Sequence, residues 1–571
     1  MLNQIQIPQN SVVLFGSGVS MWAPSDIPTG AKVRDALLNL LFNDQMRNWH
    51  KSGLRSWLDW IPFETINEFA PRSIDLSKFY SKFLDTDTPN EIHKQLVQLA
   101  TSRNVIALIT TNYDCGLEKA AGKSSPMYPV LDPSDSLPKS SIPYFKIHGC
   151  CSVPFSLVYR LNQEAILSNE KANYLHNLVD GNTLIVIGYS GVDFEICPVI
   201  SSSNAKQVIW YYQSNLLPHN YETHGYKLIS SKIKTIPFPV DLSNGLPWFQ
   251  SKVHLLPSNN RNFEKALLAI VTEEERYLWA IRIAATIGYA DQARKLLLQL
   301  PTIFMSKPAI TECNNQKGFA LFQSGCYRDS AKAFLQTAFE AEQERDYEHY
   351  ITSLLDASDS WRVGGYYGRS LFSFLKAKLI SIHHISSKIT CRLALKEALL
   401  LKSISIVIQT CQLRLIKLFF MNIVHKRGFK LVSLAKEHSA LAGLVFDQTQ
   451  LDELASIFTN RKSTQHVEMD GYEHLGYFSA STTLFRKKSL HLPISKSTIS
   501  KAEKRYSLMV LLGNHPEAWK VAARMAEIST VKNNNKWEQR VRDQIQHCQY
   551  TKWHRKHLIK WIRNGANMET I

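Results

Sequence analysis

The chain has 571 residues, 44% of them hydrophobic and 20% charged, and a formal net charge of +17. This length exceeds what one ordinary core supports, so two or more domains are expected, and the composition excludes a disordered chain. Apolar runs such as Leu184–Ile187 are far shorter than the roughly 20 residues of a membrane helix. With no secretory signal at the N-terminus, the sequence predicts a cytoplasmic protein that does not bind membranes.

The nine cysteines are scattered, apart from the adjacent pair Cys150 and Cys151. No two cysteines have the Cys-x-x-Cys spacing, so neither a zinc ribbon nor a disulfide framework is indicated, and no metal is expected. A protein of a reducing compartment fits this usage.

Charge divides the chain into two parts. Residues 1–260 hold 21 Lys and Arg against 21 Asp and Glu, so the whole excess of +17 belongs to residues 261–571. This asymmetry predicts two modules. The basic half suits an acidic partner such as nucleic acid, and a solubilising helical surface explains the excess equally well.

Short apolar runs alternate with helical patterns through the first 255 residues. Helical patterns cover, for example, residues 31–42 and 91–100. The alternation predicts a doubly wound, Rossmann-like parallel sheet, whose ligands bind at the carboxyl ends of the strands. Five runs are expected to be strands: Val12–Phe15, Val105–Ile109, Tyr144–Ile147, Leu184–Ile187 and Val208–Tyr212.

A proline-rich stretch marks the expected boundary between an α/β domain, residues 1–258, and an all-α domain, residues 259–571. It contains Pro237, Pro239, Pro247 and Pro257. Beyond it, helix pairs with turns near Gly288, Gly325 and Gly513 resemble tetratricopeptide-like hairpins, and a plain helical bundle is the alternative.

The last segment, residues 536–563, mixes basic residues with Trp537, Trp553 and Trp561. Such a mixture suits nucleic-acid binding through phosphate pairing and base stacking. An amphipathic final helix packed by its tryptophans is the alternative.

The first motif, Gly16-Ser17-Gly18-Val19-Ser20, directly follows an expected strand. Glycines there let the backbone approach a pyrophosphate, which the next helix N-terminus stabilises. The third glycine of the usual dinucleotide fingerprint is absent, which disfavours an ordinary dehydrogenase. A tight turn without a ligand is the alternative.

Three further motifs also follow expected strands. They are Thr110-Thr111-Asn112-Tyr113-Asp114, Lys146-Ile147-His148-Gly149, and Gly188-Tyr189-Ser190 with Asp193 shortly after. Taken singly, Asn112 and Asp114 suit helix caps and His148 suits a buried structural histidine.

Taken in order, the four motifs resemble those of the sirtuin family: Gly-x-Gly-x-Ser, Thr-x-Asn-x-Asp, His-Gly and Gly-x-Ser. The likeness is closer to the bacterial sirtuin-like proteins of antiphage defence, whose motifs read Thr-Asn-Tyr-Asp and Gly-Tyr-Ser followed by Asp. The segment Ile61-Pro62-Phe63-Glu64 is also similar to that branch. The resemblance spans roughly residues 10–215.

The resemblance implies NAD as the substrate and a role for most motif residues. Asn112 would hold the nicotinamide ribose or the attacking water, and His148 would be the general base. Asp193 is expected to be structural. The residues expected to bind the nucleotide are Gly16, Ser17, Gly18 and Ser20 at the phosphates, Gly188 and Ser190 at the adenosine, and Asp114 shaping the pocket.

The chain departs from protein-deacylating sirtuins in two respects. It lacks their two Cys-x-x-Cys zinc pairs, and it reads Pro24-Ser25-Asp26-Ile27-Pro28 where they carry Pro-Asp-Phe-Arg. Both differences favour hydrolysis of NAD itself over peptide deacylation.

The leading hypothesis is therefore an NAD+ hydrolase that releases nicotinamide and ADP-ribose in bacterial antiphage defence and halts the infected cell by NAD depletion. By the same resemblance, the helical half would form homo-oligomers and sense a phage-derived or nucleic-acid trigger. Two alternatives remain. One is a regulatory module that binds NAD or ADP-ribose without turnover, and the other is a nucleic-acid-binding effector acting through the basic half.

Overall fold

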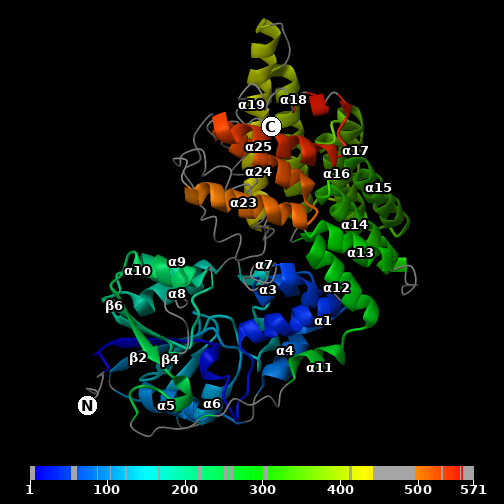
Figure 1. Cartoon of the computed structure of the whole chain (residues 1–571). Helices are drawn as coiled ribbons and strands as arrows, with labels where there is room; N and C mark the ends of the chain where they lie inside the picture. Colours follow the sequence, from blue (N-terminus) through cyan, green and yellow to red (C-terminus); the bar gives the residue numbers. More distant parts are fainter. Residues whose placement is uncertain are drawn as a thin grey trace. The chain divides into compact units, whose positions relative to one another are not determined.

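The computed structural model divides into two compact units, Met1–Thr272 and Glu273–Ile571. The first unit is α/β and the second is mostly helical, which confirms the predicted fold classes (Figure 1). The described residues are 7–52, 61–71, 73–85, 88–102, 104–122, 125–164, 167–193, 195–214, 222–249, 255, 262–286, 289–299, 307–409, 414–441, 496–528, 531–552, 554–556 and 558.

A seven-stranded sheet of order β3-β4-β2-β1-β5-β6-β7 forms the centre of the first unit, and every pair in it is parallel. All five expected strands are present, and β3 and β7 are additional. The strands are β1 (Ser11–Phe15), β2 (Val105–Thr110), β3 (Met127–Val130), β4 (Ile142–Lys146), β5 (Thr183–Ile187), β6 (Gln207–Gln213) and β7 (Thr235–Val240).

Strand β7 occupies part of the proline-rich stretch that the sequence suggested as a boundary. The strand pairs only with β6, so it is an edge strand. Pro237 and Pro239 are two residues apart, and alternate residues of a strand turn their N–H groups to the same side. Because the Val240 carbonyl accepts from Ser214 on the β6 side, both prolines face the open edge, where a missing N–H costs no ladder bond.

Alternate strand residues pack into two separate hydrophobic cores, because successive side chains point to opposite faces of a sheet. Val12, Leu14 and Trp210 pack on one face, against helices α8 (Asn169–Val179), α9 (Ile196–Ser202) and α10 (His224–Ser230). Val13 and Phe15 pack on the other, against α5 (Glu91–Ala100) and α6 (Gly116–Ala121). The result is a three-layer α/β/α unit (Figure 1).

The helices of the first unit include both expected ones. The pattern at 91–100 is α5, capped by Asn90, and that at 31–42 begins α1, which has a non-helical residue at Phe42. The helices are α1 (Gly30–Ser52), α3 (Phe63–Glu68), α4 (Leu76–Leu84), α5 (Glu91–Ala100), α6 (Gly116–Ala121), α7 (Leu161–Glu164), α8 (Asn169–Val179), α9 (Ile196–Ser202), α10 (His224–Ser230) and α11 (Phe263–Leu268). Helix α11 packs on α1 and α4, so the unit extends past residue 258.

The second unit is built of antiparallel helix pairs in its described residues. Consecutive helices from α14 to α17 pack side by side, as do α18 and α19, and α24 and α25 (Figure 1). The helices are α12 (Glu273–Thr286), α13 (Ala290–Gln299), α14 (Lys307–Gln323), α15 (Tyr327–Gln343), α16 (Tyr347–Val363), α17 (Tyr367–Ser381), α18 (Ser387–Gln409), α19 (Arg414–Leu441), α23 (Lys496–Leu511), α24 (His515–Ile528) and α25 (Val531–Gln546).

One turn geometry recurs every 20 residues between α14 and α17. Gly325, Arg345 and Gly365 each have a positive φ, of 81°, 58° and 85°. In each turn the next N–H donates to a carbonyl five residues back, as from Cys326 to Leu321 at 2.8 Å. A hairpin period of about 40 residues is longer than the 34 of a tetratricopeptide repeat. The expected turn residue Gly288 lies outside the described residues.

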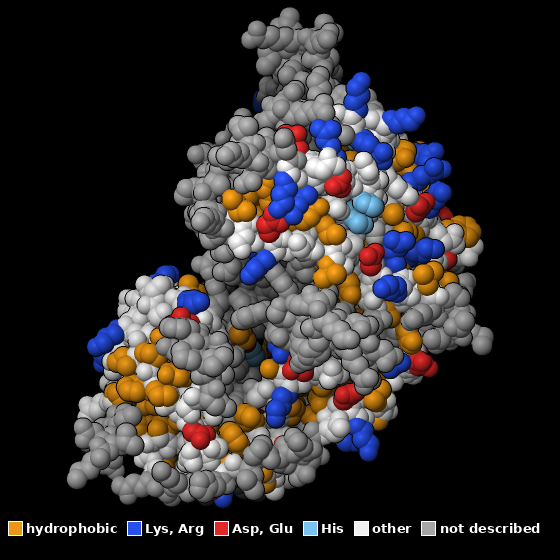
Figure 2. Space-filling model, viewed as in Figure 1, with side chains coloured by type: hydrophobic (Ala, Val, Ile, Leu, Met, Phe, Trp, Pro, Cys, Tyr) orange, Lys and Arg blue, Asp and Glu red, His pale blue; other side chains and the backbone are white. Residues whose placement is uncertain are grey.

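One of the three C-terminal tryptophans lies among the described residues. Trp537 is buried in a core with Trp519 and Tyr550, so this residue packs a helix, as the second interpretation predicted. Trp553 and Trp561 lie outside the described residues. Lys and Arg side chains spread over the helical unit between acidic and hydrophobic ones on the face that Figure 2 shows.

Candidate active site

The strand register brings the ends of four strands to one line at the carboxyl edge of the sheet. Phe15 of β1 pairs with Thr110 of β2 on one side and with Ile187 of β5 on the other, and Thr110 pairs with Lys146 of β4. Each sequence motif begins at or just beyond this line. Asn112 and His148 therefore stand two residues past a paired position on two neighbouring strands.

The loops after β1 and β5 are in direct backbone contact, which explains why they contain glycine. The Gly18 N–H donates to the Gly188 carbonyl at 3.0 Å. A Cβ on Gly16 would lie 2.8 Å from the Gly188 oxygen, and one on Gly18 would lie 2.9 Å from the Gly188 Cα. Gly188 itself has φ +61°. The glycines thus allow two loops to touch, a constraint separate from the expected approach of a phosphate.

Two of the expected nucleotide-binding side chains remain accessible. Ser17 is half-buried on the short 3-10 helix Ser17–Val19, and Ser190 is exposed beyond β5.

Ser20 and Asp114, in contrast, have their side chains tied into a buried network. The Ser20 hydroxyl donates to Asp114 Oδ2 at 2.9 Å and accepts from Asn112 Nδ2 at 3.1 Å. Asp114 Oδ1 accepts from the Gly116 N–H at 2.9 Å, at the start of α6. The network therefore links the loop after β1 to the loop after β2.

His93 of α5 completes this network, and its neighbours fix which nitrogen carries the proton. Its Nδ1 accepts from the Asn90 N–H at 3.2 Å, and its Nε2 lies 3.0 Å from the Ser20 oxygen. Burial lowers the pKa of His93, an effect larger than the opposing charge of Asp114, so the ring is neutral. The Nε2–H then donates to Ser20, whose oxygen has one donated and two accepted bonds.

Asn112 consequently has one polar atom left for a ligand. Its amide nitrogen is held by Ser20, while Oδ1 is buried and has no hydrogen-bond partner among the described residues. A buried acceptor without a partner is costly, and such groups are concentrated at functional sites.

His148 pairs with a carboxylate on the loop after β5. Its Nε2 donates to Glu195 Oε1 at 2.7 Å, and both side chains are buried. Burial by itself lowers the pKa of His148, but the hydrogen bond and charge of Glu195 outweigh it, so the net pKa is raised. Since Nε2 is engaged, Nδ1 is the nitrogen that offers a lone pair to a reactant when the ring is neutral.

Two more carboxyl groups, those of Asp193 and Glu64, lie near the His148–Glu195 pair. One oxygen each of Asp193 and Glu195 lies within 4.8 Å of a His148 nitrogen and of the other. Glu64 of α3 is buried, and burial, with a smaller contribution from Asp193, raises its pKa to about 8. Neutral pH therefore leaves Glu64 protonated beside the histidine.

Sequence reasoning missed Glu195 and His93. Glu195 comes two residues after Asp193, shortly beyond the Gly-Tyr-Ser motif. A search for carboxylates near the motifs, as possible partners of His148, could have found it. His93 carries no such signal, because only the packing of α5 on the sheet brings it to Ser20.

A SIR2-like domain model matches residues 106–208, which include Asn112, His148 and Gly188 but not the glycine turn after β1. SIR2-like domains use NAD as a substrate, so the match fits NAD-related chemistry. No curated protein matches the chain. In the part of the chain that the structure describes, no helix has the length and apolar character required to span a bilayer.

Proposed function

We propose that the first unit is an NAD+ glycohydrolase, which cleaves the nicotinamide–ribose bond to give nicotinamide and ADP-ribose. The observation that carries the proposal is the presence of two side chains, Asn112 and His148, at the same edge of the sheet, each held by a hydrogen bond to another residue. Asn112 is held by Ser20 with its Oδ1 unpartnered, and His148 is backed by Glu195.

The chemistry suits these two side chains. Nicotinamide leaves as a neutral ring once it takes the electron pair of the glycosidic bond, so no strong acid is required. The ribose carbon becomes positively charged as the glycosidic bond breaks, and water forms the new bond to that carbon. Asn112 Oδ1 accepts a hydrogen bond from the water or a ribose hydroxyl, and His148 Nδ1 receives the water proton.

The nucleotide contacts in this proposal come mainly from backbone and exposed groups. Gly16, Ser17 and Gly18 line the phosphates, and Gly188 and Ser190 line the adenosine side. Ser20 and Asp114 act through Asn112, because their side chains already bond within the buried network.

The test compares wild type with Asn112→Ala and His148→Ala, incubated with NAD while released nicotinamide is quantified. Both variants should lose activity by about 10²-fold or more, because positioning and base catalysis are lost together. Asn173→Ala and His176→Ala on α8 are matched controls that should keep wild-type activity. Normal activity in both site variants would show that the assignment is wrong.

In the same proposal the helical unit controls the activity in antiphage defence, through self-association and a phage-derived or nucleic-acid trigger. The support is the sequence resemblance. Each NAD assay is therefore run with and without lysate of infected cells, and light scattering gives the oligomeric state. Wild type that binds NAD but releases no nicotinamide under either condition supports the regulatory module instead.

A further inference from the structure

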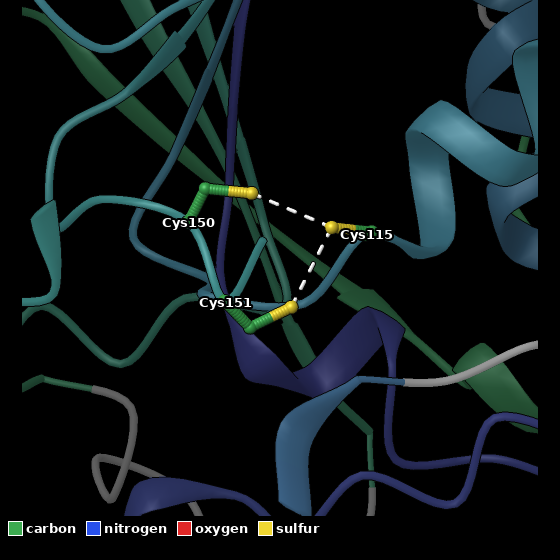
Figure 3. A group of neighbouring side chains, drawn as sticks. All are labelled: Cys115, Cys150 and Cys151. Carbon is green, nitrogen blue, oxygen red and sulfur yellow. Dashed lines mark hydrogen bonds between the residues drawn. The ribbon is translucent and has the colours of Figure 1, made fainter. Parts of the chain in front are cut away.

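Cys115 meets the adjacent pair Cys150 and Cys151 beside the candidate active site. Cys115 follows β2, and Cys150 and Cys151 follow β4 (Figure 3). The Sγ of Cys115 lies 3.4 Å from that of Cys150 and 3.5 Å from that of Cys151. All three side chains are buried, and each sulfur lies within 4.8 Å of the others.

These separations are closer to those of a metal–thiolate site than to those of a disulfide. Tetrahedral Zn²⁺ with bonds of about 2.3 Å sets its sulfurs about 3.8 Å apart. The two separations from Cys115, 3.4 Å and 3.5 Å, differ from that spacing by only a few tenths of an ångström. A disulfide, at about 2.05 Å, requires a movement several times larger.

A carboxylate adjoins one of the three sulfurs. Glu118 Oε1 lies 3.8 Å from the Cys150 sulfur, and Glu118 Oε2 is buried without a hydrogen-bond partner among the described residues. The buried Lys146 ammonium, 2.7 Å from Glu118 Oε1, offsets part of the negative charge of three thiolates. Ser152 Oγ, 3.1 Å from the Cys150 sulfur, is placed to donate to a thiolate.

The loop carrying the cysteine pair is held in one conformation. The Cys151 N–H donates to the Tyr113 carbonyl at 2.7 Å, and the Cys150 N–H donates to Ser156 Oγ at 2.9 Å. Gly149 has φ +88°, and a Cβ there would lie 2.0 Å from the Ser156 carbonyl oxygen. The backbone positions of the two cysteines are therefore set by the fold, and only their side-chain rotations remain to adjust, which favours binding by a preorganised site.

We infer that Cys115, Cys150 and Cys151 form a structural site for a thiophilic cation, Zn²⁺, that clamps the loop bearing Asn112 to the loop bearing His148. Glu118, the carboxylate beside Cys150, completes the site by a shift of its side chain. Its ligands come from the ends of two adjacent strands, which separates it from Cys-x-x-Cys zinc sites. Spacing along the sequence predicts no metal because Cys115 is 35 residues from Cys150.

The first test is the zinc content of the full chain purified without chelator, measured by inductively coupled plasma mass spectrometry. Wild type should carry about one zinc per chain. Cys115→Ser and Cys151→Ser should each fall to background. Cys197→Ala, which alters another buried cysteine, and His148→Ala, which alters the nearby histidine and carboxylate group, should keep the metal.

The second test measures thermal unfolding, so that it does not depend on NAD cleavage. Dialysis against a chelator should lower the unfolding midpoint of wild type, and added Zn²⁺ should restore it. Co²⁺ in place of Zn²⁺ should give a sulfur-to-metal charge-transfer band that Cys115→Ser lacks. A chain that carries no zinc as purified, and whose midpoint Zn²⁺ does not change, would overturn the site, as would loss of zinc only in His148→Ala.

Discussion

Two buried charged clusters, one in each unit, differ in how completely their groups are paired. In the helical unit, Asp359 of α16 accepts from Arg362 at 2.6 Å and from Lys396 of α18 at 3.0 Å. Burial raises the pKa of Asp359, but the two cations outweigh it and hold the pKa well below its usual range. Both carboxylate oxygens are satisfied, and the cluster ties two helices together.

The cluster around His148 is organised in the opposite way. A single histidine lies among the carboxyl groups of Glu195, Asp193 and Glu64, so acidic groups outnumber basic ones. Glu195 Oε2 and Asn112 Oδ1 have no hydrogen-bond partner among the described residues, and Glu64 keeps its proton. Such an arrangement costs stability. Paired buried charge thus marks a structural contact, and incompletely paired buried charge marks a site prepared for a ligand.

The largest expected effect is on stability in the paired cluster. Asp359→Asn should lower the free energy of unfolding of the helical unit by about 3 kcal/mol, because Arg362 loses its counter-charge and Lys396 keeps only Asp356, at 3.8 Å. The folded pKa of Asp359 is depressed, so its contribution is present above the unfolded value near 4 and is lost on acidification. Chemical denaturation at pH 7 and pH 3 measures this, and an equal loss at both would contradict it.

The incompletely paired cluster should respond in activity and little in stability. Glu195→Gln keeps an acceptor for His148 but removes the negative charge that supports it as a base, so kcat/KM for NAD should fall about 100-fold. The unfolding midpoint should change by no more than a few degrees. Glu222→Gln, at an accessible position of the same unit, is the control. A midpoint loss as large as that of Asp359→Asn would remove the distinction between the clusters.

The effect expected for Glu64 has the opposite sign, because Glu64 is a destabilising group. Its carboxyl holds a proton up to about pH 8 when folded, against 4.5 for the ordinary side chain. Between these values the folded state binds the extra proton, so stability falls as pH rises. Glu64→Gln should therefore unfold at a higher temperature than wild type at pH 8 and at the same temperature at pH 4. Calorimetry at both pH values decides, and a variant less stable than wild type at pH 8 would contradict the prediction.

The central strands could be predicted because their apolar character is local. Val12–Phe15 and Leu184–Ile187 are buried on both faces and are β-rich, so each is recognisable without its neighbours. The edge strands β3 and β7 carry Pro129, Pro237 and Pro239 and are partly exposed. Their pairing to β4 and β6, and not their composition, makes them strands.

The amino-acid sequence alone determined the α/β-then-helical order and the four motif loops, because strand and turn preferences are encoded in short segments. Tertiary structure alone decided which residues contact one another. It brings His93 to Ser20, the residue that holds Asn112, it pairs Glu195 with His148, and it brings the three cysteines together. The reason is physical. Hydrogen bonds and sulfur contacts require separations of a few ångströms, and only sheet register and helix packing set such separations between residues far apart along the chain.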